Sequence, residues 1–387
     1  MAKWSPSVEK RPLIHRLNFL WAGFDPTLGL LLLGLIIVGN ITFLSASSGT
    51  VVTWVEQGRN LLMAFSILWI SSRIPPKWFE KAALWVYAVG VVLLIGVATF
   101  GLIRKGARRW LNVGVVIQPS EIMKIAMPMM LAWYFQKREG FLKLWDFGVA
   151  LFFLLLPTLL IARQPDLGTA ILVFAAGLYV IILAGLPWKF ILPFVVLAAI
   201  GILLIIIFGD TVCGRDVSWP LLQSYQKHRI CTLLDPSSDP LGKGFHTIQS
   251  MIAIGSGGIF GKGWMKGTQT HLEFIPEKHT DFIFAVFSEE FGLVGNIVLL
   301  VLFILFIQRG LKIAAAAPTL FTRLLGGSIT LIFFTYAFVN MAMVSGLLPV
   351  VGVPLPFISY GGTALATLGL GVGILMSIHR HRRLVQS

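Results

Sequence analysis

One stretch decides the fold class of this chain: Pro26-Thr-Leu-Gly-Leu-Leu-Leu-Leu-Gly-Leu-Ile-Ile-Val-Gly-Asn-Ile-Thr-Phe-Leu44. It is almost wholly apolar and has the length, roughly 20 residues, that a helix needs to cross the hydrocarbon core of a bilayer. Similar runs recur, and the whole chain has a hydrophobic fraction of 56% and a mean hydropathy of +0.84. We therefore expect an all-α polytopic membrane protein.

The number of such runs predicts about ten transmembrane helices. The clear runs cover residues 26–44, 82–103, 147–162, 167–186, 190–208, 292–307 and 324–344. Three more are short or interrupted by polar residues and cover 61–74, 119–135 and 363–378. An even number of spans places both ends of the chain on one side of the membrane.

Lysine and arginine set the expected orientation, because cytoplasmic loops are enriched in both. Lys3, Lys10, Arg11 and Arg16 precede the first run, which is longer than the apolar region of a signal peptide and should be retained as an anchor. With both ends cytoplasmic, most other basic residues of the short loops fall on the same side. Much of the net charge of +14 therefore comes from lysine and arginine in cytoplasmic loops. Because membrane topology accounts for this positive charge, we exclude nucleic acid as a partner.

Residues 1–387 should form a single membrane domain, because no repeat or attached soluble module is visible. Within it, residues 209–291 form a large extracytoplasmic loop whose mixed polarity predicts short interfacial helices. Its last part, residues 281–291, should lie along the interface, because Glu289 and Glu290 are costly in hydrocarbon. We expect it to pass into the next span at Gly292.

The only two cysteines, Cys213 and Cys231, both fall in this loop. Two thiols without a second pair do not make a zinc site. The spacing leaves open whether they form a disulfide, which an oxidising compartment would permit.

Two other segments are expected to be non-helical. The glycine-rich run 255–263 lacks the spacing of a phosphate-binding loop and indicates a turn between interfacial helices. Residues 346–362 combine three prolines with many apolar side chains. Irregular backbone at membrane depth survives only where protein or water covers it, so we expect this loop to line a cavity, with a plain surface loop as the alternative.

Ionisable residues gather at the external ends of the spans. They are Arg108, Arg109, Trp110 beside them, Glu121, Lys124, Arg163, Asp166 and Asp281. Cations beside carboxylates suit an amphiphile whose tail stays in lipid while an anionic headgroup, such as a pyrophosphate, is held by arginine and lysine. The alternative for each residue is an interfacial pair that satisfies its own charge, or, for the basic loop 104–109, contact with lipid phosphates.

Asp281 closes the polar stretch Phe274-Ile-Pro-Glu-Lys-His-Thr-Asp281. An aspartate in the first turn of a helix is commonly structural, because it offsets the helix dipole. The same position keeps the carboxylate ionised and able to take a proton from a sugar hydroxyl, a contribution of roughly 100- to 10,000-fold in rate. His279 is the competing base, followed by Glu273 and Glu277.

Several motifs together resemble a known family. They are Gly-Ala-Arg-Arg-Trp-Leu from Gly106, Gln118-Pro-Ser-Glu121, Arg163-Gln-Pro-Asp-Leu-Gly-Thr169, Pro-Glu-Lys-His-Thr-Asp-Phe from Pro276, and the signature from Asn340 to Gly362. Over nearly its whole length the chain resembles the bacterial SEDS proteins (shape, elongation, division and sporulation). With a basic residue, Lys278, at this motif position, the chain resembles the elongation branch of that family.

The resemblance implies ten spans in the bacterial inner membrane with cytoplasmic termini. It also implies a peptidoglycan glycosyltransferase that polymerises lipid II, the undecaprenyl-pyrophosphoryl disaccharide pentapeptide, into β-1,4 glycan strands during cell elongation. Asp281 matches the family's essential aspartate and would be the general base of an inverting reaction. By the same resemblance, Arg109 and Lys124 would neutralise the pyrophosphate leaving group.

The other motif residues would contact substrate: Arg108, Trp110, Glu121, Arg163, Asp166, Lys278 and His279. No tightly bound cofactor is expected, while the need for a divalent cation, Mg²⁺ or Mn²⁺, stays open. The implied partners are a class B penicillin-binding transpeptidase and other membrane proteins of the elongation complex.

Two other functions remain open: a lipid II flippase, and a scaffold that only positions the transpeptidase. A flippase needs a polar path across the whole membrane. Here the ionisable residues lie near the external edge and the centres of the spans are almost uncharged, which favours chemistry at one face.

Overall fold

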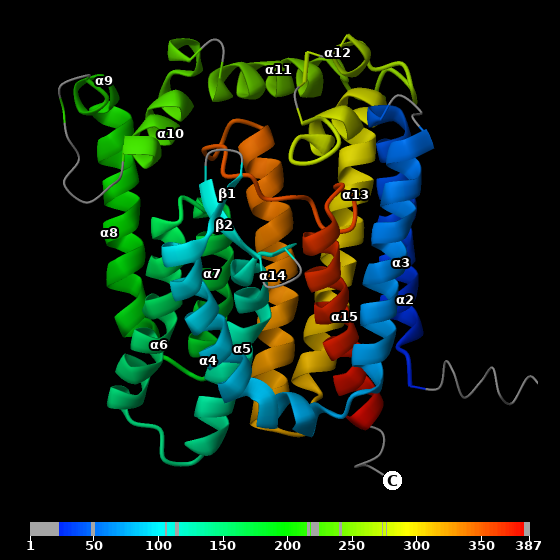
Figure 1. Ribbon diagram of the computed structural model, residues 1–387. Helices are drawn as coiled ribbons and strands as arrows, with labels where there is room; N and C mark the ends of the chain where they lie inside the picture. The colour runs from blue at the N-terminus through cyan, green and yellow to red at the C-terminus, as the bar shows by residue number, and fades with distance from the viewer. Residues whose placement is uncertain are drawn as a thin grey trace, which may run out of the picture.

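The computed structural model describes residues 23–47, 51–104, 107–112, 116–214, 217, 224–239, 242–272, 274–275 and 277–382. The basic residues before position 23, and also Lys105, Glu273 and Pro276, lie outside this part of the chain. Long helices dominate the described residues and run side by side as one bundle (Figure 1).

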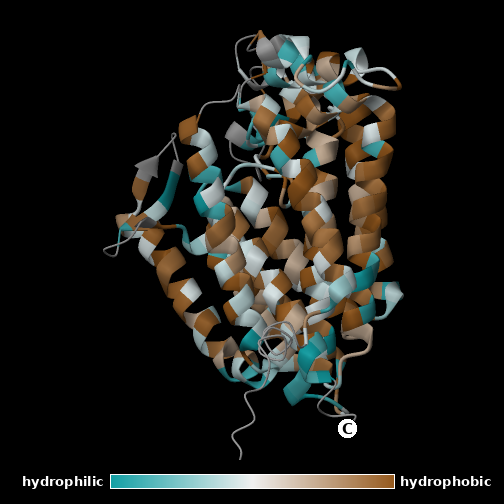
Figure 2. Ribbon diagram, turned by 90° about the vertical axis from the view of Figure 1, so that its right-hand side faces the viewer, coloured by the Kyte–Doolittle hydropathy of each residue, from teal (hydrophilic) through white to brown (hydrophobic). Residues whose placement is uncertain are grey.

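The described residues contain ten helices of 17 residues or more, the number of spans predicted. They are α2 (Pro26–Ala46), α3 (Val51–Arg73), α4 (Pro76–Phe100), α5 (Pro119–Lys137), α6 (Leu144–Arg163), α7 (Leu167–Leu183), α8 (Trp188–Ile207), α13 (Ile283–Ala315), α14 (Leu320–Val344) and α15 (Gly362–Arg382). Seven of them are long and apolar enough to cross a membrane. Figure 2 shows hydrophobic residues along the middle of the helices and hydrophilic residues toward both ends.

The three helices outside those seven are α3, α5 and α7. The first two carry charged residues, such as Glu56 and Lys124, inside the helix, and α7 is short at 17 residues. The predicted span 61–74 was wrong at its start, because α3 begins at Val51. The charged residues Glu56 and Arg59 lower the hydropathy of the first turns of α3, so the apolar pattern does not reveal that these turns are helical.

The two ends of the described chain lie at the same end of the bundle. Arg309 of α13 pairs with Asp25, which precedes α2, and His379 of α15 lies 3.6 Å from the same carboxylate. Asp25 also caps α2 by accepting a hydrogen bond from the Leu28 amide at 2.7 Å. We call this the terminal end, and the opposite end, which holds Asp281, the loop end.

The long helix α13 is broken at Gly292, where the backbone adopts φ 63° and ψ −161°. Residues 283–290 before the break are buried within the protein, and their expected position along the membrane interface stays a prediction. Glu289 is satisfied inside by Lys262 at 2.7 Å. The expected transition at Gly292 is confirmed.

The glycine-rich run forms the predicted turn and closes against this break. The amides of Lys262 and Gly263 donate to the carbonyl oxygens of Glu289 and Glu290, each at 3.0 Å. A Cβ on Gly261 would lie only 2.1 Å from the Glu290 carbonyl oxygen, so glycine is required for this contact. The run therefore supplies hydrogen-bond partners to an interrupted helix.

A small antiparallel sheet, which was not predicted, follows α4. It consists of β1 (Leu102–Arg104), β2 (Ala107–Asn112) and β3 (Val116–Ile117), in the order β1-β2-β3. The segment between α4 and α5 is too short for another span. Pairing of its strands gives hydrogen-bond partners to backbone N–H and C=O groups that do not belong to a helix. The all-α expectation is thus correct for the bundle and incomplete for this loop.

Short helices cover the loop end, as expected. They are α9 (Gly209–Val212), α10 (Ser224–Leu234), the 3-10 helix η1 (Pro236–Ser238), α11 (Lys243–Ser256) and α12 (Thr268–His271). Figure 1 shows α11 and α12 lying across the top of the bundle. Cys213 and Cys231 form a disulfide that joins the end of α9 to α10.

Candidate active site

Asp281 lies in a turn directly before α13. The amides of Thr280 and Phe282 donate to the Glu277 carbonyl oxygen at 3.0 and 3.4 Å, and Glu277 has a left-handed φ of 51°. The helix begins only at Ile283. Asp281 therefore belongs to the turn rather than to the first turn of the helix, where it was expected.

Asn340 of α14 fixes this turn from the side. Its fully buried amide nitrogen donates to the carbonyl oxygens of Asp281, at 2.8 Å, and of Val353, at 2.7 Å. Across the gap, a Cβ on Gly352 would lie 3.2 Å from Asp281 Oδ2. Gly352 also has a left-handed φ of 77°, so both the close contact and the backbone conformation favour glycine at this position.

Much of the loop that connects α14 to α15 is buried, so it is not a plain surface loop, and the cavity that it was expected to line stays a prediction. Val353, Leu355 and Phe357 are at most 4% exposed. The Tyr360 amide donates to the His279 carbonyl oxygen at 2.9 Å, which ties the loop to the turn of Asp281. The loop also touches the start of α7, because a Cβ on Gly168 would lie 2.7 Å from the Val351 carbonyl oxygen.

A charged network lies on the far side of that loop. Asp166 caps α7 by accepting from the Thr169 amide, and its other oxygen accepts from Gln118 Nε2 at 2.9 Å. Arg109 of β2 lies 3.8 Å from Asp166 and also donates to the Pro165 carbonyl oxygen. Its side chain remains 31% exposed, so this guanidinium is accessible to a ligand.

Lys124 and Glu121 form the deeper part of the network. Lys124 Nζ lies 2.6 Å from Glu121 Oε1, and it also donates to the Tyr336 hydroxyl oxygen. Glu121 accepts a further hydrogen bond from Thr367 of α15 at 3.1 Å. The Lys124 side chain is only 3% exposed, so its charge is balanced within the protein.

Helix α14 connects the two halves of the site. Tyr336, which contacts Lys124, and Asn340, which holds Asp281, are four residues apart and so lie on one face of the helix. The loop from Val351 to Val353 contacts Asp281 on one side and Gly168, at the start of the helix that Asp166 caps, on the other. Helix α14 and this loop are thus shared by the turn of Asp281 and by the charged network.

Three predicted site residues lie apart from this network. Arg108 alternates with Arg109 along β2 and donates to the Ala98 carbonyl oxygen at 3.1 Å, so it points to the other side of the strand. Trp110 shares that side with Arg108 and pairs with Leu102 in the sheet. Arg163 is exposed at the end of α6, while its neighbour Gln164 is buried against the Leu94 carbonyl oxygen.

The side chains of Lys278 and His279 are both engaged by the protein. Lys278 donates to the Thr270 carbonyl oxygen at 2.9 Å. The ring of His279 meets that of Tyr360 edge to face, with centroids 6.1 Å apart. The Tyr360 hydroxyl donates to Glu56 of α3 at 2.8 Å, and burial together with this hydrogen bond raises the pKa of Tyr360.

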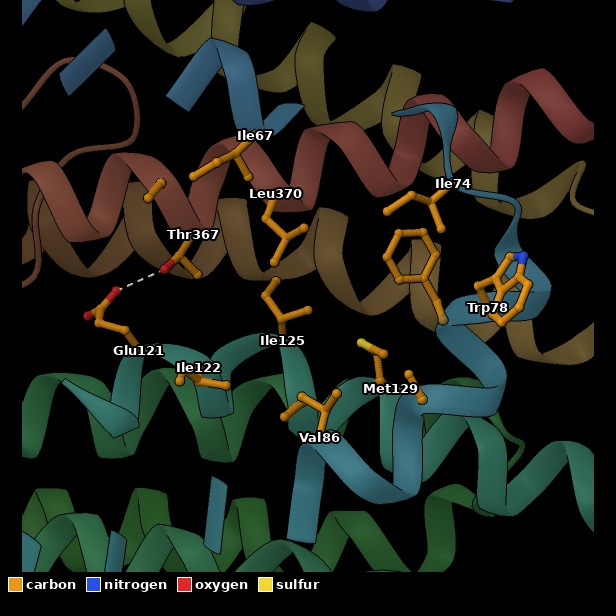
Figure 3. Close-up of a pocket in the computed structure, with 14 residues that line it drawn as sticks. Ile67, Ile74, Trp78, Val86, Glu121, Ile122, Ile125, Met129, Thr367 and Leu370 are labelled. Atoms are coloured by element: carbon orange, nitrogen blue, oxygen red, sulfur yellow. Dashed lines mark hydrogen bonds between the residues drawn. The ribbon is translucent and has the colours of Figure 1, made fainter. Parts of the chain in front are cut away.

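An apolar groove extends from the network along the bundle (Figure 3). It lies between α3, α4, α5 and α15 and encloses about 510 Å³. Ile125, Met129 and Leu370 line its length, while Glu121 and Thr367 form its polar end. A long hydrocarbon chain in this groove would place its head beside the charged network.

No group of three or more histidine, cysteine or acidic side chains is placed to hold a metal ion within the described ranges. The carboxylates of the site are instead engaged by arginine, lysine, amide and hydroxyl donors.

Sequence reasoning missed several residues that build the site. Contacts to predicted residues or to their backbone are made by Tyr336, Thr367, Asn340, Gln118 and Tyr360. Glu56 in turn accepts a hydrogen bond from Tyr360. A usable signal existed in α14, where Tyr336 and Asn340 place two polar side chains on one face of an apolar helix.

Comparison with known proteins agrees with this architecture. The family model described as cell cycle protein, FtsW/RodA/SpoVE, matches residues 24–384. The chain belongs to this family, whose members are the SEDS proteins that the motifs resembled.

Relatives and solved structures cover most of the chain. The peptidoglycan glycosyltransferase MrdB of Escherichia coli K12 is 49% identical over 93% of this chain and 95% of its own length. Stage V sporulation protein E of Bacillus subtilis is 36% identical over 76% of this chain and 77% of its own length. A chain of a peptidoglycan synthase complex superimposes with a TM-score of 0.76 and 31% identity over 94% of this chain and 99% of its own length. The rod-shape-determining protein RodA of Thermus thermophilus gives a TM-score of 0.67, with 25% identity over 94% of this chain and 98% of its own.

Proposed function

We propose that this chain is a peptidoglycan glycosyltransferase that polymerises lipid II into β-1,4 glycan strands during cell elongation. The observation that carries the proposal is the segment 351–353, which contacts Asp281 on one side and Gly168, in the first turn of the helix that Asp166 caps, on the other. A base beside an anion-binding cluster is what displacement of a pyrophosphate by a sugar hydroxyl requires. The names of the relatives support the same activity.

Asp281 is the general base of this reaction. It takes the proton of the GlcNAc 4-hydroxyl of one lipid II molecule, and that oxygen attacks the anomeric carbon of the terminal MurNAc of the growing chain. The bond from this carbon to the pyrophosphate breaks, and undecaprenyl pyrophosphate leaves with the bonding electrons. The α-linked donor becomes a β-linked product, so the reaction inverts configuration.

Arg109 and Lys124 differ in their roles. Arg109 is accessible and its contact with Asp166 is long, so it can turn to the leaving pyrophosphate. Lys124 is enclosed by Glu121 and Tyr336, so it acts on the leaving group through the field of the network. Asp166 orients Arg109, and Arg108, Trp110, Arg163, Lys278 and His279 are assigned to the surroundings of the substrate.

The apolar groove accommodates the undecaprenyl chain of one substrate, because its polar end opens at Glu121. No tightly bound cofactor takes part in this scheme. A divalent cation, Mg²⁺ or Mn²⁺, would arrive with the pyrophosphate, whose oxygens are the hard ligands that these ions prefer.

The terminal end faces the cytoplasm and the loop end faces the outside of the inner membrane, since arginine and lysine concentrate at the former. The chain works with a class B penicillin-binding transpeptidase and with other membrane proteins of the elongation complex. The similarity to a chain of a peptidoglycan synthase complex supports that partnership.

The test is polymerisation by the purified chain and its transpeptidase partner in liposomes that contain lipid II. Wild-type protein should make glycan strands, and Asp281→Asn should make none while keeping its thermal midpoint. Glu277→Gln, a change in the same turn, should retain activity. Full activity of Asp281→Asn would refute the assigned base, scrambling of lipid II without polymer would indicate a flippase, and a folded complex that forms no product would indicate a scaffold.

A further inference from the structure

A turn at residues 258–264 fills the break in α13. After the break, the amide of Leu293 donates to the Gly258 carbonyl oxygen at 3.0 Å. The next amide, that of Val294, donates to the Ile259 carbonyl oxygen at 3.1 Å. Amides at the start of a helical segment have no partner within it, so the turn supplies the acceptors that they need. Together with the two hydrogen bonds before the break, these contacts fix the backbone of the turn to a long helix.

The same turn is tied to α2, inside the apolar part of that helix. Trp264 Nε1 donates to the Ile41 carbonyl oxygen at 3.1 Å. Ile41 lies more than one helical turn before Ala46, the last residue of α2. The Ser45 hydroxyl, nearer the end of α2, donates to Glu290 just before the break in α13. Since α2 and α13 are both long and apolar enough to cross a membrane, the turn lies at the depth of their apolar segments at the loop end.

The apolar side chains of this turn are exposed. Phe260 is 82% exposed and Ile259 is 60% exposed, although hydrogen bonds hold the backbone of the turn on both sides of the break. The Trp264 ring is also exposed, as are Leu293 and Val294 beside the turn. Neighbouring apolar side chains that gather in one exposed patch mark a contact with another molecule, either a protein or a membrane.

The patch continues two exposed apolar rows on the membrane helices. On α2 the exposed row consists of Leu30, Leu33, Ile37 and Ile41. On α13 it consists of Leu293, Ile297, Leu300 and Ile304. The spacing of three or four residues puts each row on one face of its helix, and on a spanning helix such a face contacts hydrocarbon. The turn lies where both rows reach the loop end, because it binds the backbone of Ile41 in one and of Leu293 in the other.

The turn presents no lone charge to its surroundings. Lys262 is the one charged side chain of residues 258–264, and its Nζ lies 2.7 Å from Glu289 Oε1. It also donates to the Thr268 hydroxyl oxygen at 2.7 Å. This ammonium is thus paired within the protein, and insertion of the turn into lipid leaves no unpaired charge in hydrocarbon.

We propose that residues 258–264 insert into the membrane leaflet at the loop end, with Ile259, Phe260 and Trp264 as the inserted side chains. The partner of the patch is the hydrocarbon of that leaflet. Trp264 suits the border with the headgroups, because its ring is apolar and its indole N–H is already bound to the Ile41 carbonyl oxygen. The turn thus anchors the short helices of the loop end at a fixed height above the membrane.

This height is passed on to the turn of Asp281 through a short chain of contacts. Glu289, which pairs with the anchoring turn, accepts from the Thr270 amide of α12 at 3.3 Å. Lys278 donates to the Thr270 carbonyl oxygen at 2.9 Å, and it belongs to the turn that contains Asp281. The anchor itself is a property of the fold and does not depend on the polymerase reaction.

Spin labelling of the full chain in phosphatidylcholine nanodiscs tests the anchor. Cys213 and Cys231 are joined in a disulfide and do not react with a thiol-specific nitroxide, so single introduced cysteines can be labelled. In Phe260→Cys and Ile259→Cys, the label should collide with oxygen more often than with a water-soluble nickel complex. Its depth should be about 5–10 Å into the boundary between headgroups and acyl chains.

Leu272→Cys is the matched control, because Leu272 is also apolar, is 63% exposed and lies directly after α12 at the loop end. Its label should meet the nickel complex in water. Ile297→Cys, on the exposed row of α13, gives the reference for hydrocarbon.

Oxygen access at Phe260→Cys close to that at Ile297→Cys would support the anchor. Nickel access at Phe260→Cys and Ile259→Cys equal to that at Leu272→Cys would overturn the proposal. Poor access of both oxygen and nickel would overturn it as well, since protein, such as a second copy of the chain, would then cover the patch.

Discussion

Asn340 holds Asp281 by its main chain, through a hydrogen bond of 2.8 Å from the side-chain amide to the carbonyl oxygen. The same amide nitrogen binds Val353 in the neighbouring loop at 2.7 Å. The position of the proposed base is therefore set by a long helix rather than by the flanking polar segment. Because Tyr336 lies one turn earlier, that helix also fixes the distance from the base to the cation network.

Replacing Asn340 by alanine should lower the rate of lipid II polymerisation more than it weakens substrate binding. Two buried carbonyl groups lose their donor, at about 1–3 kcal/mol each, so the turn of Asp281 is no longer held in place. Initial rates at several lipid II concentrations should show a fall of at least about tenfold in kcat with a smaller change in KM. Wild-type kcat in a folded Asn340→Ala variant would contradict this role.

Tyr360 and Glu56 should act as a pair in positioning the same turn. Tyr360→Phe keeps the ring against His279 and the backbone hydrogen bond but removes the hydroxyl that Glu56 accepts. We expect Tyr360→Phe and Glu56→Ala each to reduce kcat about fivefold, the effect of one lost hydrogen bond of about 1 kcal/mol. The double variant should be no worse than either single one, and additive losses would show that the two residues act separately.

Lys124 and Glu121 should stabilise the fold only as a pair. Lys124→Met leaves a carboxylate with its main cation removed, and breaking a buried pair from one side costs about 3–5 kcal/mol. Glu121→Gln should cost at least as much, because it leaves the ammonium of Lys124, whose side chain is only 3% exposed, without its carboxylate. Thermal midpoints of the single and double variants would test this, and a double variant as unstable as the sum would contradict the coupling.

Acid should remove the contribution of Asp25 to stability. Desolvation raises the pKa of this carboxyl group, but the hydrogen bonds from Arg309 and Leu28 outweigh it and bring the pKa below its ordinary value of 3.8. A lowered pKa in the folded state adds stability at pH values above the unfolded pKa, and this is lost as pH falls through the folded one. The difference in thermal midpoint between wild type and Asp25→Asn should be constant near neutral pH and shrink below about pH 4. A constant difference throughout would contradict the ion pair.

The helices were predictable because each must satisfy its backbone within the membrane and bury apolar length. The strands of residues 102–117 were not, since basic residues in short segments carry no hydropathy signal and pairing depends on their neighbours. The start of α3 was missed for a related reason, because Glu56 and Arg59 are accommodated by contacts with Tyr360 and its surroundings.

The candidate site was predictable as a set of residue types but not as an arrangement. Composition and spacing singled out Arg109, Glu121, Lys124, Asp166 and Asp281. The structure pairs Arg109 with Asp166 and Lys124 with Glu121, while Asp281 contacts the loop at Gly352, and their common site stays a prediction. Strand alternation separates Arg108 from Arg109, which spacing alone could not foresee. The contacts through Asn340 and Tyr336 join segments about 60 to 210 residues apart, beyond the reach of local patterns.

Helix α8 has no buried residue, and a disulfide ties the short helix that follows it to α10. Because none of its residues is buried, we expect the sequence of this helix to be constrained by little more than apolarity and length. Its sequence should drift freely among relatives, and a library of apolar substitutions across residues 188–207 should be nearly neutral. The same library in α14 would be depleted at almost every position.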